Sequence, residues 1–101
     1  IKKLTPSWFG LPILINKKFI RNKNKYLNYL KKNGIETRPI ISGNFLNQPA
    51  AKLYKLKKGN NFFKNADEIE KRGFFIGLHT QKINQNTIKL LTNKLLMVNK
   101  L

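Results

Sequence analysis

Cysteine, histidine, acidic residues and long apolar runs are absent or scarce in this 101-residue sequence, and each scarcity excludes a class of function. With no cysteine there is no disulfide framework, no thiolate nucleophile and no cysteine-ligated zinc or iron–sulfur site. One histidine and four carboxylates are too few for an ordinary multi-ligand metal site, so no metal is expected. The apolar runs fall far short of the ~18 residues that a membrane span needs, so no membrane partner is expected.

The start of the sequence suggests a piece of a longer protein. It reads Ile-Lys-Lys-Leu-Thr-Pro and leads directly into a strand-like run at Trp8, with neither an initiator Met nor a visible signal peptide. A chain of this length makes one domain, residues 1–101, and we expect a cytoplasmic location. The 41% hydrophobic content is enough for a folded core despite the high charge.

The charge is strongly one-sided, with 21 Lys and Arg against 4 Asp and Glu, a net charge of +17. Such an excess is typical of polyanion binding, so a small basic nucleic-acid-binding module is one hypothesis. Only three of the cations are arginines, although phosphate clamping and base readout favour the bidentate guanidinium. The lysines are scattered along the chain. Lys, Asn and Ile also have codons rich in A and T, so a genome of biased base composition would enrich them without any selected partner. We therefore prefer a solvated surface of biased composition, and nucleic acid is not the expected partner.

The first half of the chain predicts a strand, a helix and a second strand. The apolar run at 8–15 contains Pro12, which cannot donate to a sheet ladder, so this strand belongs at an edge or is bulged. A helix is predicted over 20–33, because apolar residues recur there near the 3.6-residue period. Gly34 fits the left-handed residue that ends such a helix. The second strand is predicted over 35–41.

The second half begins with two short helices. Pro49 in the first turn marks a helix that should reach about Lys57 and end near Gly59. Asn65 is predicted to cap the next helix, with Glu68 reaching back three residues to complete a capping box.

A buried strand over 74–78 and a last helix capped by Asn84 complete the pattern. Two aromatic pairs are interpreted as core residues rather than base-stacking platforms: Phe62-Phe63 and Phe74-Phe75. Three strands are too few for a doubly wound sheet, so the predicted fold class is α+β: a small three-stranded, mostly antiparallel sheet with helices on one face. The other face is left to dock on something else.

Residues suited to catalysis are sparse. No carboxylate lies near His79 in the sequence and no serine has an evident base, so no catalytic residue is expected in this chain. His79 follows the predicted buried strand. It is either a hydrogen-bonded structural residue or a polar group lining a cleft at the strand's end.

Arg38 and the Ser42-Gly43-Asn44 turn form the most suggestive cluster. A strand-end guanidinium beside exposed turn amides fits a phosphate or sugar-hydroxyl site. The alternative is that Arg38 pairs with Glu36 or a helix end and that the turn is ordinary. The spacing alone leaves both interpretations open.

An ordered set of segments resembles one known family. The segments 33–39, 42–45 and 48–50 together resemble the C-terminal small domain of the sugar-nucleotide aminotransferases related to DegT, DnrJ, EryC1 and StrS. Further matching stretches cover nearly the whole chain: 7–13, 65–67, 73–79 and, in pattern only, 81–96. Many aminotransferases of that family carry an R-x-H-Y pattern, whereas Pro39-Ile40-Ile41 follows Arg38 here. This departure looks more like the branch that removes the 3-hydroxyl of 4-keto-6-deoxy nucleotide sugars.

The resemblance implies a fold-type-I enzyme that uses pyridoxal phosphate or pyridoxamine phosphate in O-antigen or other surface-polysaccharide synthesis. It implies a large domain, absent from this chain, that holds the cofactor and supplies the Schiff-base Lys, or the His that replaces it in 3-dehydratases. The partners implied are that large domain, a second subunit in a homodimer and a nucleotide-sugar substrate. Alone, residues 1–101 are expected to be inactive.

The resemblance and the chemistry together assign a substrate-binding set: Arg38, Ser42, Gly43, Asn44 and His79. No cofactor-binding or metal-binding residue is expected in the chain. Its role would be to close one wall of the sugar-nucleotide cleft, and the resemblance leaves aminotransfer and dehydration both open. An exposed apolar patch is expected where the large domain would dock.

Overall fold

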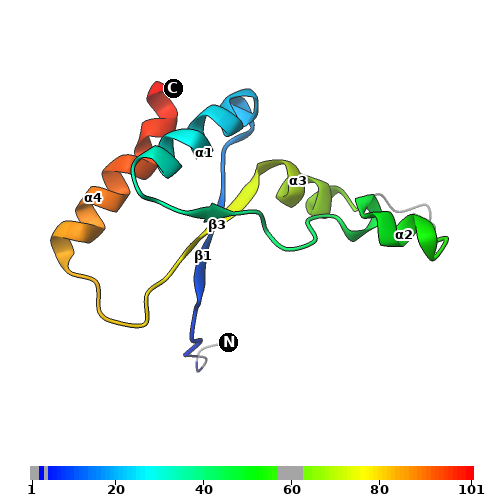
Figure 1. The fold of residues 1–101 in the computed structure, drawn as a ribbon, viewed down its shortest axis with the longest axis horizontal. Helices are drawn as coiled ribbons and strands as arrows, with labels where there is room; N and C mark the ends of the chain where they lie inside the picture. The colour runs from blue at the N-terminus through cyan, green and yellow to red at the C-terminus, as the bar shows by residue number, and fades with distance from the viewer. Residues whose placement is uncertain (1–2, 4, 57–62) are drawn as a thin grey trace.

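The computed structural model describes residue 3 and residues 5–56 and 63–101. Within these residues three strands form one sheet: β1 (Gly10–Leu14), β2 (Thr37–Arg38) and β3 (Gly73–Gly77). The strand order is β1-β3-β2 and both pairings are antiparallel, which confirms the predicted α+β class. In Figure 1, α1 and α4 lie on one side of the sheet, while α3 and α2 lead away on the other.

The positions and lengths of the strands follow from where proline and apolar residues lie in the sequence. Pro12 lies in the edge strand β1, opposite Phe75, which confirms the prediction for that strand. The central strand β3 begins at Gly73, one residue before the predicted start. The prediction of a second strand over 35–41 was wrong in length, because only Thr37 and Arg38 pair with β3. Pro39 has no N–H to extend that ladder.

The helices among the described residues are α1 (Lys23–Lys32), α2 (Pro49–Leu53), α3 (Lys64–Arg72) and α4 (Gln85–Leu96), with 3-10 turns at Lys17–Asn22, Phe45–Asn47 and Met97–Lys100. Gly34 has φ +78, which confirms it as the left-handed residue after α1. The Asn84 side chain accepts a hydrogen bond from the Thr87 N–H, which confirms the cap of α4. The predicted helix over 20–33 begins as a 3-10 turn, so its regular part is shorter than expected.

The predicted start of α3 was wrong. The helix begins at Lys64 with Phe63 in the cap position, and no side chain caps it. Asn65 therefore lies inside the helix. Glu68 does not reach back but bonds Arg72 one turn later, where a guanidinium offers a stronger, charged partner than a backbone N–H.

The end of α2 also differs from the prediction. The helix stops at Leu53 rather than near Lys57, and the predicted end at Gly59 lies outside the described residues. Lys55 adopts φ +53 immediately after the helix, so the chain has already left the helical path there.

The core lies between the sheet and the helices α1 and α4, and its buried members are Ile15, Tyr26, Leu30, Phe74 and Ile76. The Tyr26 ring meets Phe74 edge-on at 6.0 Å, and its hydroxyl donates to the Leu95 carbonyl at 2.8 Å. Phe74 is thus core, as predicted, but alternation along β3 places Phe75 on the opposite face. The prediction for Phe63 was wrong, since it is 54% exposed, and Phe62 lies outside the described residues.

The opposite face of the sheet is open. The accessible surface is 8839 Å², against about 5,900 Å² for a compact monomer of this size. The radius of gyration is 16.4 Å, against about 13 Å for a compact domain of this length. Large apolar side chains are exposed near the start of β1 and after β2: Trp8, Phe9 and Ile41. The expected exposed apolar face is therefore present.

Two kinds of feature are not found among the described residues. None of the helices there has the length and apolar character needed to cross a membrane. Nor do three or more His, Asp or Glu side chains gather there as they would around a metal ion.

Candidate substrate-binding face

Three adjoining hollows run from the edge of the sheet beside α4 onto its open face. The sheet-edge cavity has a volume of about 430 Å³ and is lined by Phe9, Gly34, Ile35, Glu36, Arg38, Phe75, Ile76, Gly77 and Leu91. The apolar hollow has about 280 Å³ and is lined by Ser7, Trp8, Phe9, Gly10, Pro12, Ile40, Ile41 and Phe75. The turn cavity has about 210 Å³ and is lined by Pro39, Ile40, Ile41, Ser42, Gly43, Gln48 and Glu70. Shared lining residues join each hollow to the next.

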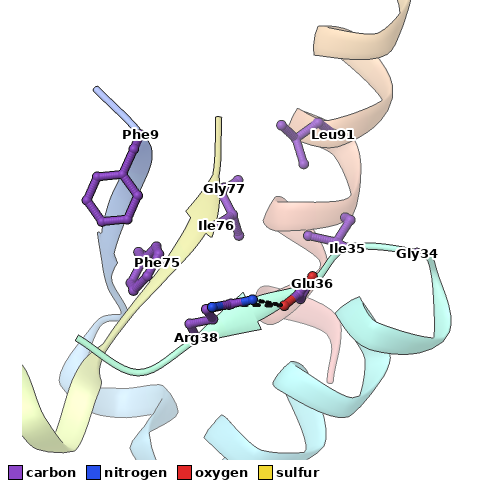
Figure 2. A pocket seen from close by; sticks show the side chains of 9 residues that line it. All are labelled: Phe9, Gly34, Ile35, Glu36, Arg38, Phe75, Ile76, Gly77 and Leu91. Carbon is purple, nitrogen blue, oxygen red and sulfur yellow. Dashed lines mark hydrogen bonds and ion pairs between the residues drawn. The ribbon is translucent and has the colours of Figure 1, made fainter. Parts of the chain in front are cut away.

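Arg38 and Glu36 form the polar side of the sheet-edge cavity. The Arg38 Nε and Nη2 groups donate to the same Glu36 oxygen, Oε1, at 3.0 and 2.9 Å (Figure 2). The pairing of Arg38 with Glu36, one of the two interpretations left open by the sequence, is therefore what the structure shows. Both side chains are largely exposed, so the pair is worth little and a ligand can take its place at small cost.

Two glycines and two phenylalanines shape the other side of this cavity. Gly10 pairs with Gly77 across the sheet, and a Cβ added at Gly77 would meet no atom within 4 Å. At Gly10 the Phe75 ring occupies that place, 2.7 Å from such a Cβ. Phe9 contacts Phe75 edge-to-face at 5.5 Å (Figure 2). A strand glycine often marks a place where a ligand or another backbone approaches closely, and Gly77 leaves that space open.

The Ser42-Gly43 turn lies in the turn cavity, against α3. Ser42 and Gly43 both have positive φ, +66 and +49, and the Gly43 N–H donates to the Ile40 carbonyl at 3.0 Å. A Cβ at Gly43 would lie 2.8 Å from the Glu70 side chain, so glycine is needed there for space as well as conformation. A carboxylate this close favours a hydroxyl donor over a phosphate at this turn.

Asn44 lies beneath the turn and is buried. Its amide nitrogen donates to Asp67 Oδ1 at 2.6 Å, and its oxygen accepts from the Leu46 N–H at 3.1 Å. Asn44 therefore caps the following 3-10 turn and ties it to α3. Its assigned contact with substrate stays a prediction.

His79 lies beyond the end of β3 and lines none of the three hollows. Its Nδ1 accepts from the Gln81 N–H at 3.0 Å in an exposed turn. Arg38, Ser42 and Gly43 thus lie along one face, whereas His79 lies apart from the hollows. Its assigned place in a cleft also stays a prediction.

The C-terminal half of α3, which carries Glu70, is held by charged contacts. Lys23 Nζ donates to the carbonyls of Lys71 and Gly73, each at 3.0 Å, and partial burial lowers the Lys23 pKa. The hydrogen bond from Arg72 holds the pKa of the Glu68 carboxyl below its ordinary value. These contacts fix the wall of the turn cavity.

Sequence reasoning did not single out Phe9, Glu36 or Gly77 as site residues. The signals were present: Glu36 and Arg38 are two apart on one strand and so share a face, and Gly77 interrupts a run of apolar strand residues. Assigning the face, however, required the register with β3, which the sequence alone does not supply.

Comparison with known proteins finds two relatives named for a nucleotide-sugar substrate and one named for lipopolysaccharide biosynthesis. The chain is 38% identical over 74 residues to the GDP-4-keto-6-deoxy-D-mannose 3-dehydratase of Escherichia coli O55:H7, covering 72% of this chain and 19% of that protein. It is 32% identical over 88 residues to the protein of the same name from Yersinia pseudotuberculosis, covering 86% of this chain and 22% of that one. It is 31% identical over 78 residues to the lipopolysaccharide biosynthesis protein RfbH of Salmonella typhimurium, covering 77% of this chain and 18% of that protein.

The chain therefore spans about a fifth of the length of the curated relatives that it matches. No protein-family model matches the chain, and no solved structure matches it. At this low identity, the relatives support the dehydratase branch of the sugar-nucleotide enzymes that the residue pattern resembles.

Proposed function

We propose that this chain is the cleft-closing small domain of a sugar-nucleotide 3-dehydratase of O-antigen biosynthesis. The observation that carries the proposal is the 38% identity over 74 residues to the Escherichia coli enzyme of that name. The Pro39-Ile40-Ile41 sequence after Arg38 agrees with it, because it departs from the aminotransferase pattern in the same direction.

The cofactor, pyridoxal phosphate or pyridoxamine phosphate, is proposed to bind another part of the polypeptide. When bound, it would supply the electron sink for loss of the 3-hydroxyl. The sheet-edge cavity, the apolar hollow and the turn cavity are lined by neither Lys nor His, so their residues do not fit a Schiff-base site.

The open face is proposed to be covered by that other part of the polypeptide and by a second subunit. Its middle section, the apolar hollow, has aromatic and aliphatic walls suited to a protein surface. Arg38 and the Ser42-Gly43 turn lie at its two ends and are proposed to contact the nucleotide sugar. Asn44 is proposed to act through the turn, since Asp67 and Leu46 hold its side chain.

The experiment uses the complete reading frame that encodes this chain. The purified protein is incubated with GDP-4-keto-6-deoxy-D-mannose and pyridoxamine phosphate, and the sugar product is identified by mass spectrometry. We expect loss of the 3-hydroxyl, with the rate falling about tenfold or more in Arg38→Gln if one charge-assisted contact is lost. Arg21→Gln is the matched control, because Arg21 is exposed and lines none of the three hollows.

The product separates the outcomes. A 4-amino sugar with its 3-hydroxyl intact would show aminotransfer in place of dehydration. No turnover to either product, by a folded protein loaded with cofactor, would overturn the proposal.

A further inference from the structure

We propose that Asp67 and Glu70 of α3 are positioning residues, which hold the turn at 42–47 in the shape that the substrate meets. This inference rests on the proposed function, because it explains how a turn proposed to contact the nucleotide sugar keeps its conformation. Three observations carry it: the backbone conformation of the turn, its side-chain contacts with α3 and the packing of Glu70 against Gly43.

The turn holds a backbone conformation that a residue with a side chain does not favour. Ser42 has φ +66 and Gly43 has φ +49, so two consecutive residues lie in the left-handed region. For Ser42, which carries a Cβ, this conformation costs free energy. Such a residue keeps it only where the surrounding structure fixes it, and residues of this kind gather at active sites and ligand clamps. The contacts that fix this turn therefore bear on binding.

The contacts within the turn are weak. The Gly43 N–H donates to the Ile40 carbonyl at 3.0 Å, and the Gln48 amide donates to the Ser42 carbonyl at 3.2 Å in an exposed position. Hydrogen bonds between neutral groups contribute little net stability, because water offers the same groups equivalent partners. These two contacts alone do not account for the conformation of Ser42.

The stronger contacts come from α3. Asp67 and Glu70 are three residues apart, so they lie on the same face of the helix. Asp67 Oδ1 accepts from the Asn44 amide at 2.6 Å, and Glu70 Oε2 accepts from the Asn47 amide at 2.6 Å. Hydrogen bonds to an ionised acceptor are shorter and roughly twice as strong as those between neutral groups. We call these two carboxylates and two amides the carboxylate clamp.

Burial and packing make the carboxylate clamp rigid. The Asn44 residue is 4% exposed, and its side-chain oxygen also accepts from the Leu46 N–H at 3.1 Å, so both polar atoms of that side chain are held. A Cβ added at Gly43 would lie 2.8 Å from the Cβ and Cγ atoms of Glu70. The stem of Glu70 therefore lies against the left-handed backbone, while its carboxylate holds Asn47.

The same geometry favours an indirect role for Asn44. Its side chain is buried, both of its polar atoms are bonded, and it is not among the residues that line the turn cavity. Asp67 lines none of the three hollows either. An effect of Asp67 on substrate binding must therefore pass through the turn, whose Ser42 and Gly43 do line the cavity.

The test exchanges the donor and the acceptor of one clamp contact. The complete protein, without cofactor, is titrated by calorimetry with GDP-4-keto-6-deoxy-D-mannose. Asp67→Ala removes the acceptor for Asn44, and we expect the affinity to fall about tenfold or more, the scale of one hydrogen bond to a charged group. The double variant Asn44→Asp/Asp67→Asn reverses donor and acceptor and keeps an acceptor for the Leu46 N–H, so it should restore most of the affinity.

The double variant also keeps the net charge and the side-chain sizes. It therefore tests the carboxylate clamp even if Asp67→Ala lowers the yield of folded protein. Steady-state kinetics with pyridoxamine phosphate should show a raised KM and a kcat near that of the parent in Asp67→Ala. This is the pattern expected when a contact made equally in the ground state and the transition state is lost.

Asn84→Ala is the matched control for stability. It also removes one side-chain hydrogen bond, the 2.8 Å contact with the Thr87 N–H that caps α4, and Asn84 lines none of the three hollows. It should lower the thermal unfolding temperature, because a helix cap is lost, while leaving the affinity for the nucleotide sugar as it is. A merely structural role for Asp67 would give the same result in Asp67→Ala.

An affinity unchanged in Asp67→Ala, or an equal loss in Asn84→Ala, would overturn the inference. So would a loss that the double variant does not restore, because Asn44 would then meet the substrate itself. The proposed function fails separately. Dehydration by the parent together with any of these results would sink the inference alone, whereas the expected affinities without turnover of the sugar would sink the dehydratase proposal alone.

Discussion

Glu68 has two ionic partners in the described part of the chain, Arg72 and Lys17. Its Oε2 lies 2.5 Å from Arg72 Nη1, and its Oε1 lies 3.5 Å from Lys17 Nζ. The hydrogen bond from Arg72 is the main reason that the Glu68 pKa is lower than its ordinary value of 4.5. A carboxyl whose pKa is lower when folded stabilises the folded state fully above its unfolded pKa. That stabilisation is lost as the pH falls through the folded pKa.

We therefore expect Glu68→Gln to lower the thermal unfolding temperature of the chain at pH 7, and the difference from the parent to shrink steadily below the ordinary glutamate pKa. Thermal unfolding followed by circular dichroism at several pH values between 7 and 3 measures this. Glu36→Gln is the control, because its exposed ion pair contributes little. A difference that stays constant over this range would show that the charge of Glu68 is not what matters.

At the scale of elements, local signals predicted the helices and strands best where their cause is local. Gly34, Pro49 and Asn84 act through backbone conformation or a neighbouring N–H, and the structure confirms all three. Asn65 failed as a cap because another local contact competed with it: the helix already begins at Lys64, and Glu68 bonds Arg72 four residues ahead instead of reaching back.

In the candidate site, too, residues with a local signal were predicted and residues brought in by distant strands were not. Arg38 was found from its position at a strand end, and its pairing with Glu36 was one of the two interpretations left open. Gly77 and Phe9 were not found, because they join the cavity only through the β1–β3 register and a ring contact. Residues brought together by strands far apart in sequence cannot be assigned to one face without the sheet order.

Lys23 joins two elements by one side chain. It begins α1, and its Nζ donates to the last carbonyls of α3 and to Gly73 at the start of β3. Helix-end carbonyls favour a cation, because they have no intrahelical partners and carry the negative end of the helix dipole.

Replacing Lys23 with Met keeps the apolar stem but removes these donors. We expect Lys23→Met to reduce the free energy of unfolding by about 1–2 kcal/mol, the scale of hydrogen bonds to a charged group at a helix end. Urea unfolding of the chain measures it, with Lys31→Met as the control on the exposed side of the same helix. Equal effects of the two substitutions would contradict a role for the α3 carbonyls.

At the scale of the whole molecule, the open face and the net charge of +17 have opposite effects on self-association of the chain. The exposed surface exceeds that of a compact monomer by about 2,900 Å², more than the ~800 Å² that each partner buries in a standard interface. Apolar side chains such as Trp8 and Ile41 favour association, whereas like charges on every copy oppose it.

Salt therefore distinguishes docking through the open face from polyanion binding. Salt screens repulsion between copies, so self-association of the isolated chain should strengthen from about 50 mM to 500 mM salt. Binding to DNA or RNA should weaken steeply over the same interval, because it depends on release of counterions. Sedimentation velocity across the salt series measures self-association, and binding of a fluorescent oligonucleotide measures nucleic-acid affinity.

The double variant Trp8→Lys/Ile41→Lys should abolish self-association, since it places charges in the apolar hollow, while leaving the core untouched. A chain that stays monomeric at every salt concentration, yet holds the oligonucleotide at 500 mM, would reverse this assignment of the open face.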